Sequence, residues 1–201
     1  ELLAILPELI VIGTACLILA LDPILAASKK DLLAWLTLGA LAICLGLTTS
    51  HMTGRASAFS GMVVIDAYAA FWKLLLYIVT GLTVLLSLAY LKAERLSIGE
   101  YYGFILLALA GMMVMVSGAD LLTIYLGTEL MSLSLYVMAG LKRTEARSLE
   151  ASAKYFVLGA FSSGILLYGI SLLFGLAGST GLSAIAAAIT THGTGDPLLS
   201  M

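Results

Sequence analysis

One stretch constrains this chain more than any other. The 20 residues 121–140, LLTIYLGTELMSLSLYVMAG, are almost wholly apolar and carry a single acid, Glu129, near their middle. A helix of this length, rising about 1.5 Å per residue, matches a bilayer core about 30 Å thick. The sequence therefore predicts a membrane-spanning helix with Glu129 near the membrane centre. Since an acid at that depth costs about 2.5–3.5 kcal/mol, it is expected to face protein or a water-filled cavity.

Glu129 has polar neighbours at helical spacing. Tyr125, Glu129, Ser132 and Tyr136 follow one another at steps of four, three and four residues, which predicts a polar stripe on one helix face. Such a stripe can carry water and protons, and acids within membrane spans usually mark ion or proton paths. The alternative is structural, with Glu129 holding helices together by hydrogen bonds across a bundle.

The composition places the whole chain in the membrane class. Of its 201 residues, 61% are hydrophobic and 11% are charged, whereas soluble domains carry about 25% charged residues. The expected fold is all-α, a polytopic bundle of about six transmembrane helices. Basic residues are dispersed over loops, so no nucleic-acid partner is expected. Cys16 and Cys44 lie inside apolar runs, without a CxxC or histidine-spaced metal motif, and are predicted core residues.

Hydropathy and helix-breaking residues divide the chain into six spans. They are predicted at about residues 2–21, 32–48, 63–91, 101–116, 121–140 and 148–176. The stretch 49–61, with His51 and Arg55, is predicted to be a loop, and the tail 177–201 a loop holding a short apolar helix at 182–190. The first apolar run is interpreted as a retained span, because no basic segment and small-residue cleavage site precede it.

Charged residues also enter the third and sixth predicted spans. Lys73 follows Asp66 by seven residues on the same helix face, and we favour the interpretation that it snorkels to the near interface. Glu150 precedes Lys154 by four residues, the favourable orientation for a helical ion pair. The position of Lys154 suits two interpretations equally, snorkelling to the interface or facing inward as an ionisable partner.

The basic residues predict an orientation. They concentrate in alternate loops, whereas the intervening loops offer only Arg55. The members of these loops are Lys29, Lys30, Lys92, Arg95, Lys142, Arg143 and Arg147. Because cytoplasmic loops carry the excess of Lys and Arg, both ends of the chain are expected on the outer side of the membrane. Glu150 and Lys154 then lie near the cytoplasmic entrance, and Glu129 lies at the midplane.

The run 120–175 resembles subunit N of bacterial respiratory complex I, the proton-pumping NADH:quinone oxidoreductase. The resemblance rests on LGTELMSLSLY, which contains Glu129, and on KYFVLGAFSSGILLYG, which begins at Lys154. The first-span pattern LPELI extends it over essentially the whole chain. Thr128 stands where this family usually has an aliphatic or small residue, and its hydroxyl is a candidate influence on the hydration of the neighbouring acid.

The resemblance implies a fold of about fourteen helices with two inverted repeats. Residues 1–98 would supply three leading helices, residues 99–176 the start of the first antiporter-like repeat, and residues 177–201 a loop before a seventh span. It also implies a share in redox-coupled proton translocation. Glu129 would be the essential carboxylate, paired with a lysine outside this sequence, and Glu150 and Lys154 would serve the cytoplasmic side of the proton path.

The implied setting is a bacterial inner membrane, with lipid and the other complex I membrane subunits as partners. NADH, FMN, iron–sulfur clusters and quinone would be bound by those other subunits, and no cofactor or metal by this chain. The sequence agrees, because it contains no GxGxxG motif after a strand and no cysteine cluster.

Two other hypotheses stay open. The chain could belong to a multisubunit cation/proton antiporter, which sodium-driven proton flux without a redox subunit would favour. It could instead be a non-transporting membrane scaffold in which Glu129 and Lys154 only fix helix packing. Replacing Glu129 by Gln separates the hypotheses, since a scaffold should lose assembly whereas a proton carrier should assemble and fail to pump.

Overall fold

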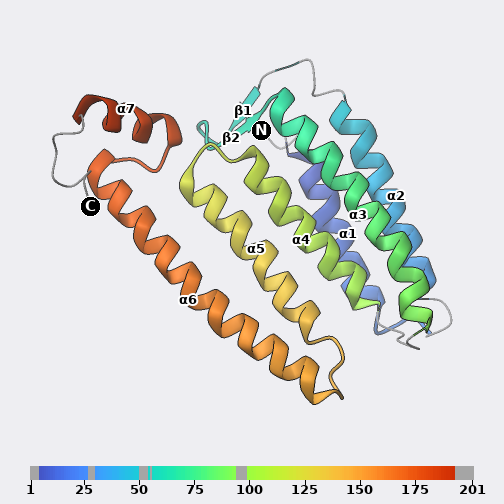
Figure 1. Cartoon of the computed structure of the whole chain (residues 1–201). Helices are drawn as coiled ribbons and strands as arrows, with labels where there is room; N and C mark the ends of the chain where they lie inside the picture. Colours follow the sequence, from blue (N-terminus) through green and yellow to red (C-terminus); the bar gives the residue numbers. More distant parts are fainter. Residues whose placement is uncertain (1–4, 27–29, 50–53, 55, 94–98, 193–201) are drawn as a thin grey trace.

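The structure is a computed structural model that describes residues 5–26, 30–49, 54, 56–93 and 99–192. Within these residues the chain forms seven helices and one two-stranded hairpin. In chain order the elements are α1 (Leu6–Leu21), α2 (Asp31–Thr49), β1 (Ala56–Ala58), β2 (Val63–Ile65), α3 (Ala67–Ala93), α4 (Glu100–Ser117), α5 (Leu121–Ala139), α6 (Ala146–Ala177) and α7 (Leu182–His192). Figure 1 shows α1 to α6 running alternately up and down, with the hairpin and α7 at one end.

Five helices, α2 to α6, are long and apolar enough to cross a membrane. Helix α1 is also apolar, but its 16 residues extend only about 24 Å at 1.5 Å per residue, and residues 1–4 lie outside the described part of the chain. The predicted spans thus correspond to α1 through α6, and the short helix expected at 182–190 is α7. The prediction of an all-α membrane bundle is confirmed.

The connection between α2 and α3 differs from the prediction. Strands β1 and β2 pair antiparallel, where the sequence had predicted a loop at 49–61 followed directly by the third span. That span begins as a helix only at Ala67. The difference arises because a short apolar run such as β2 is compatible with either a strand or a helix. His51 and Arg55, assigned to the loop, lie outside the described residues.

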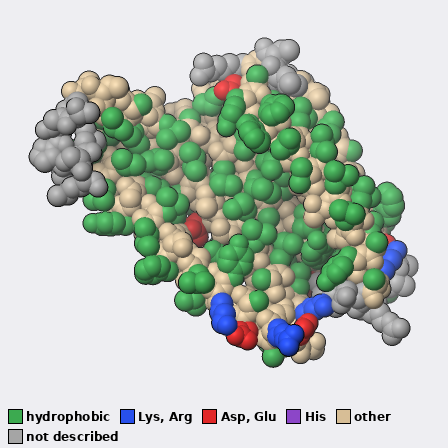
Figure 2. Space-filling view, in the orientation of Figure 1, with side chains coloured by type: hydrophobic (Ala, Val, Ile, Leu, Met, Phe, Trp, Pro, Cys, Tyr) green, Lys and Arg blue, Asp and Glu red, His purple; other side chains and the backbone are tan. Residues whose placement is uncertain are grey.

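Helices α1 to α4 share an apolar core. Each contributes fully buried side chains, namely Val11, Ala15 and Ile18 from α1, Leu33, Ala34 and Cys44 from α2, Val84 from α3, and Leu106, Leu109, Ala110 and Met113 from α4. Hydrophobic side chains also cover much of the outer surface (Figure 2). Because lipid is as apolar as this core, close packing and hydrogen bonds hold such helices together more than the hydrophobic effect does.

Helices α4 and α5 approach most closely at Gly111 and Gly127. A methyl group added at Gly111 would lie 2.5 Å from the Gly127 carbonyl oxygen and 2.6 Å from the Met131 backbone nitrogen. A methyl group at Gly127 would lie 2.7 Å from the Gly111 carbonyl oxygen. Small residues permit this backbone contact between membrane helices. The contact therefore sets the position of Glu129, two residues after Gly127, against the leading bundle.

Backbone hydrogen bonds close the end of the bundle that carries the hairpin. The Ala119 N–H donates to the Met62 carbonyl at 2.9 Å, and the Leu121 N–H donates to the Thr180 carbonyl at 2.9 Å. The Leu182 N–H in turn donates to the Ala119 carbonyl at 3.0 Å. The start of α5 thus binds both the hairpin and the segment that leads from α6 into α7.

Asp120 begins α5 as its N-cap. One carboxylate oxygen accepts a hydrogen bond from the Leu122 N–H at 2.8 Å, and the other accepts the Thr180 hydroxyl at 2.6 Å. Such a cap is worth about 1 kcal/mol. With α5 starting here, Glu129 lies about 12 Å along the helix from this end and about 15 Å from the other, near the middle of a bilayer core.

The α4–α5 contact generates a stability prediction. Gly111→Ala should force the two helix backbones apart and cost about 1–3 kcal/mol, because neither neighbour is the free end of a side chain. The matched control is Gly81→Ala in α3, whose new methyl group would meet Leu38 and Leu41 at an ordinary 3.9 Å. The readout is the yield of the purified protein and its thermal midpoint. Equal behaviour of the two variants would contradict the prediction.

Candidate functional site

Glu129 lies half-buried between α5 and α6. The Ser163 hydroxyl on α6 donates a hydrogen bond to the Glu129 carboxylate, and the Tyr125 hydroxyl lies 3.0 Å from the Ser163 Oγ. A serine hydroxyl has only one proton to donate. Because Ser163 uses that proton on Glu129, Tyr125 must be the donor to Ser163. The three side chains form a directed hydrogen-bond chain that ends on the carboxylate.

The direction of this chain depends on the protonation of Glu129. A protonated Glu129 can donate to Ser163, which then donates to Tyr125, so all the hydrogen bonds reverse. Both hydroxyl groups can accept and donate at the same time. The arrangement can therefore stabilise either protonation state and pass a proton along the interface of α5 and α6.

Of the two remaining residues of the predicted polar stripe, Ser132 and Tyr136, only Tyr136 is observed to face α6. Tyr136 is buried, with its ring edge-on to Tyr155 at a centroid distance of 4.7 Å. Its hydroxyl occupies the space beside Gly159, where an added methyl group would lie 1.8 Å from the oxygen. Ser132 is half-buried, and within the described part of the chain its side chain makes no hydrogen bond. Tyr125, Glu129 and Tyr136 are thus brought onto α6, whereas Ser132 makes no hydrogen bond among the described residues.

Thr128 is directed away from Glu129. Its hydroxyl lies 2.9 Å from the Ile124 carbonyl oxygen on its own helix and 3.0 Å from the Met115 sulfur on α4. Successive residues of a helix project about 100° apart, so neighbours in sequence do not share a face. The Thr128 hydroxyl therefore serves the α4–α5 contact.

Glu150 and Lys154 form the ion pair that their spacing predicts. Both side chains are largely exposed, at 62% and 71% respectively, and an exposed pair of this kind contributes only about 0.3–0.5 kcal/mol. Lys154 lies about 14 Å along α6 from the level of Ser163 and hence of Glu129. The structure therefore does not bring Lys154 together with Glu129. Figure 2 shows Lys and Arg side chains gathered along the lower edge, opposite the hairpin.

Most of α6 is uncovered. Only Ile170 is buried on this helix, and its large exposed side chains include Phe156, Val157, Leu158, Phe161, Ile165, Leu166, Tyr168 and Leu172. The small residues of α6 divide into two groups. Gly159 and Ser163 face α5, whereas methyl groups added at Gly164 or Gly169 would meet nothing within 4 Å.

A buried charge pair was missed at the sequence level. Lys73 of α3 places its Nζ 2.5 Å from an oxygen of Glu8 in α1, and the two residues are only 3% and 4% exposed. The prediction that Lys73 snorkels to the interface is wrong, because an opposite charge on a neighbouring helix satisfies the ammonium inside the bundle. The usable signal was the presence of one acid and one base at comparable depth in two different spans.

Other polar groups of the leading helices gather near this pair. The Cys44 thiol of α2 lies 3.6 Å from the carbonyl oxygen of Pro7, next to Glu8, and the hydroxyls of Thr48 and Tyr77 lie 3.2 Å apart. The second carboxylate oxygen of Glu8 has no hydrogen-bond partner within the described chain. In Figure 1, α4 stands between these leading helices and α5, so this set is separate from Glu129.

The two cysteines differ in their surroundings. Cys44 is buried, as predicted, whereas Cys16 is exposed on α1 and its assignment to the core is wrong. When a membrane helix is apolar on all sides, its sequence does not show which face packs against the protein and which faces lipid. Among the described residues, no group of three or more His, Cys, Asp and Glu side chains is placed to hold a metal ion.

Comparison with known proteins agrees with the fold and the motifs. The family model described as NADH:quinone oxidoreductase/Mrp antiporter, TM, matches residues 118–200. The chain is 43% identical over 198 residues to NADH-quinone oxidoreductase subunit N 2 of Rhizobium meliloti, covering 98% of this chain and 41% of the relative. It is 44% identical over 190 residues to subunit N of Maricaulis maris, covering 94% of this chain and 40% of the relative.

Solved structures give the same result. A chain of respiratory complex I from Thermus thermophilus matches with a TM-score of 0.73 and 27% identity, over 96% of this chain and 40% of that chain. A chain of an archaeal membrane-bound sulfane sulfur reductase shares the fold, with a TM-score of 0.75. The chain belongs to the antiporter-like membrane subunit family. The curated relatives just described are subunit N of NADH-quinone oxidoreductase, and the chain spans about two fifths of their length.

The Glu8–Lys73 pair leads to a prediction about assembly. Lys73→Met should destabilise the leading bundle by about 3–5 kcal/mol, because it leaves a buried carboxylate uncompensated. Adding Glu8→Gln to Lys73→Met should restore most of that loss. The measurement is the yield and thermal midpoint of the assembled complex. Lys92→Met, which removes an exposed partner of Asp31, is the control and should shift stability by at most about 1 kcal/mol. Equal loss in the single and double variants would refute a compensating pair.

Proposed function

We propose that the chain takes part in proton translocation within a bacterial NADH:quinone oxidoreductase, with Glu129 as the carboxylate that carries the proton at mid-membrane. The observation that carries the proposal is the hydrogen-bond chain from Tyr125 through Ser163 to Glu129, half-buried between two membrane-length helices. Quinone reduction takes place in other subunits, which hold NADH, FMN, iron–sulfur clusters and quinone.

Glu129 changes between a protonated and a charged form in this mechanism. A lysine from a segment outside this sequence pairs with the carboxylate and favours the charged form. A conformational or electrostatic change that arrives from the quinone-reducing end separates the pair. Since a carboxylate without a partner is unfavourable in a dry site, Glu129 then takes up a proton. Ser163 and Tyr125 support both forms because their hydrogen bonds can reverse.

Glu150 and Lys154 serve the cytoplasmic side of the path in this proposal. They lie in the first turns of α6, which begins at the end of the bundle where Lys and Arg side chains gather (Figure 2). The positive-inside rule assigns this end to the cytoplasm. Both ends of the chain then face the outer side of a bacterial inner membrane. The separation of about 14 Å between Lys154 and the level of Glu129 requires water or further side chains to connect them.

The proposal also assigns a role to each group of helices. Helices α1 to α3 form the leading unit, with the Glu8–Lys73 pair inside it. Helices α4 to α6 begin the first antiporter-like repeat and carry the proton-path residues. The uncovered face of α6 meets other helices of the subunit or neighbouring membrane subunits of the complex.

The direct test is NADH-driven proton uptake by vesicles that contain the assembled, full-length complex. Glu129→Gln should assemble normally and lose most of its pumping, because the amide keeps the shape of the side chain but cannot carry the proton. Glu145→Gln is the matched control, since Glu145 is exposed before α6 and pairs only loosely with Lys142, at 3.8 Å. Loss of assembly with Glu129→Gln would favour the scaffold hypothesis, and normal pumping would exclude Glu129 from the path.

A second prediction tests the hydrogen-bond chain itself. Ser163→Ala should lower proton uptake about ten-fold, because a hydrogen bond to a charged group contributes about 1.5–3 kcal/mol. Ser162→Ala is an adjacent control on the same helix, where the exposed hydroxyl donates only to the Leu158 carbonyl of its own helix. Its rate should stay within about two-fold of the wild type. Similar rates for the two variants would remove Ser163 from the mechanism.

A cation/proton antiporter subunit is the second candidate, because the family model that matches residues 118–200 covers both kinds of subunit. Both candidates use Glu129 in the same way. They differ in the driving force, so a sodium gradient that drives proton flux through the complex without NADH would favour the antiporter.

A further inference from the structure

The hydroxyl groups of Ser132 and Tyr136 lie between Glu129 and the basic end of the bundle. They follow Glu129 on α5 by three and seven residues, which places them about one and two helical turns further along that helix. Ser132 is half-buried and Tyr136 is 8% exposed, and within the described part of the chain neither hydroxyl forms a hydrogen bond. Because a hydroxyl without a partner is unfavourable in such surroundings, each is a place where a water molecule can bind.

The side chain of Tyr136 extends along α6 in the direction of Glu129. Its backbone carbonyl accepts the Ser152 hydroxyl at 2.7 Å, its ring lies edge-on to Tyr155, and its hydroxyl lies beside Gly159, seven residues after Ser152. Side chains of a helix point toward the N-terminus of that helix, which in α5 is the direction of Glu129. The Tyr136 hydroxyl is therefore closer to Glu129 than the backbone of Tyr136 is.

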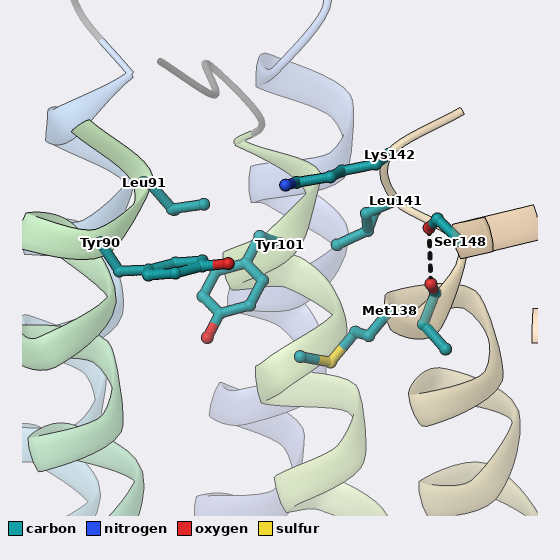
Figure 3. Close-up of a pocket in the computed structure, with 8 residues that line it drawn as sticks. Tyr90, Leu91, Tyr101, Met138, Leu141, Lys142 and Ser148 are labelled. Atoms are coloured by element: carbon teal, nitrogen blue, oxygen red, sulfur yellow. Dashed lines mark hydrogen bonds between the residues drawn. The ribbon is translucent and has the colours of Figure 1, made fainter. Parts of the chain in front are cut away.

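Hydrogen bonds and ring contacts between α5 and α6 hold Tyr136 in this position. The Ser148 hydroxyl donates to the Ala139 carbonyl at 2.7 Å (Figure 3), so two serines of α6, Ser148 and Ser152, bind the last turn of α5. The ring of Phe156 adds a second edge contact to Tyr136, at a centroid distance of 5.9 Å. The Tyr136 hydroxyl is therefore carried by a ring that is fixed between the two helices.

Gly159 leaves the space that the Tyr136 hydroxyl needs. A methyl group added at Gly159 would lie 1.8 Å from the hydroxyl oxygen and 2.4 Å from the ring carbon that carries it, so any larger residue would displace the hydroxyl. Gly159 and Ser163 face α5 one helical turn apart, and both are half-buried. Water can therefore reach the strip of α6 surface that leads from the Tyr136 hydroxyl to Ser163.

The Tyr136 hydroxyl divides the interval between Lys154 and Glu129 into two short steps. Gly159, which marks the level of this hydroxyl, lies five residues after Lys154 and four before Ser163, or about 7.5 Å and about 6 Å along α6. Two successive hydrogen bonds of about 2.8 Å cover about 6 Å, so a single water can join Tyr136 to Ser163. Without the hydroxyl, the whole interval of about 14 Å would need about five successive hydrogen bonds through water alone.

We propose that the Tyr136 hydroxyl relays protons from the Lys154 end of the bundle to Ser163 and Glu129, and that Gly159 is the positioning residue of this relay. The inference rests on the proposed function and extends it to the cytoplasmic half of the path. It gives Gly159 a role that no charge or hydroxyl of its own could supply.

The relay keeps every group in balance. A water on the Lys154 side transfers a proton to the Tyr136 oxygen while the original hydroxyl proton passes to the water beside Ser163, so one O–H bond forms as the other breaks and Tyr136 stays neutral. Ser163 has two lone pairs, one of which accepts the Tyr125 hydroxyl, so the other can accept this water. Ser163 then passes its own proton to Glu129.

The test is NADH-driven proton uptake by vesicles that contain the assembled, full-length complex, measured in H₂O and in D₂O. Tyr136→Phe keeps the ring and its packing but removes the hydroxyl, and should lower proton uptake about ten-fold, the effect of losing one hydrogen bond in the path. The ratio of the rates in H₂O and D₂O should rise, because proton transfer becomes the slow step. Tyr90→Phe, which removes a hydroxyl from a tyrosine of α3 that is 57% exposed, is the matched control and should stay within about two-fold of the wild type.

A second variant tests the positioning role. Gly159→Ala leaves the hydroxyl in the chain but displaces it, and should lower proton uptake and raise the isotope ratio as Tyr136→Phe does. Gly81→Ala is its control, since the added methyl group meets its neighbours at 3.9 Å. A native gel establishes that each variant assembles, and Tyr136→Phe decides the question if Gly159→Ala does not assemble.

The outcome for Glu129→Gln separates this inference from the proposed function. Loss of pumping with Glu129→Gln, together with a wild-type rate and isotope ratio for Tyr136→Phe, would overturn the relay and leave the function in place. Normal pumping with Glu129→Gln would overturn both. A lower rate for Tyr136→Phe with an unchanged isotope ratio would assign Tyr136 to packing alone and also overturn the relay.

Discussion

The absence of water in the bilayer core governs this structure, because each buried charge or hydroxyl must find its partner within the protein. Glu129 accepts a hydrogen bond from Ser163 on α6, and Lys73 forms an ion pair with Glu8 on α1. Each of these contacts joins two different helices, α5 with α6 and α1 with α3. The same requirement thus stabilises the bundle and concentrates its titratable groups at helix interfaces, where a change in packing alters their protonation.

The two buried charged sites differ in a way that suits different roles. The Glu8–Lys73 pair is neutral overall, nearly inaccessible and internal to the leading helices. A buried pair of this kind specifies one arrangement of helices without adding much stability. Glu129 is only half-buried and has a neutral hydroxyl as its partner. Its position beside the largely uncovered helix α6 is compatible with the proposed role of a proton carrier.

Different interactions hold the helices together at the two ends of the bundle. At the hairpin end, backbone hydrogen bonds and the Asp120 cap join the hairpin, α5 and the segment before α7. At the opposite end, ion pairs such as those of Arg143 with Glu100 and Lys92 with Asp31 link neighbouring helices. The Lys and Arg side chains gather at this opposite end (Figure 2).

The sequence by itself determined the membrane class, the approximate helices, the place of Glu129 near the middle of its helix and the Glu150–Lys154 pair, because hydropathy and i,i+4 contacts are local properties. It could not determine the hairpin, since short apolar runs are ambiguous. Only the tertiary structure decided that Lys73 pairs with Glu8, that Ser163 holds Glu129 and that Thr128 faces α4. Those partners depend on which helix faces meet, and the uniformly apolar surface of a membrane helix does not encode its inward face.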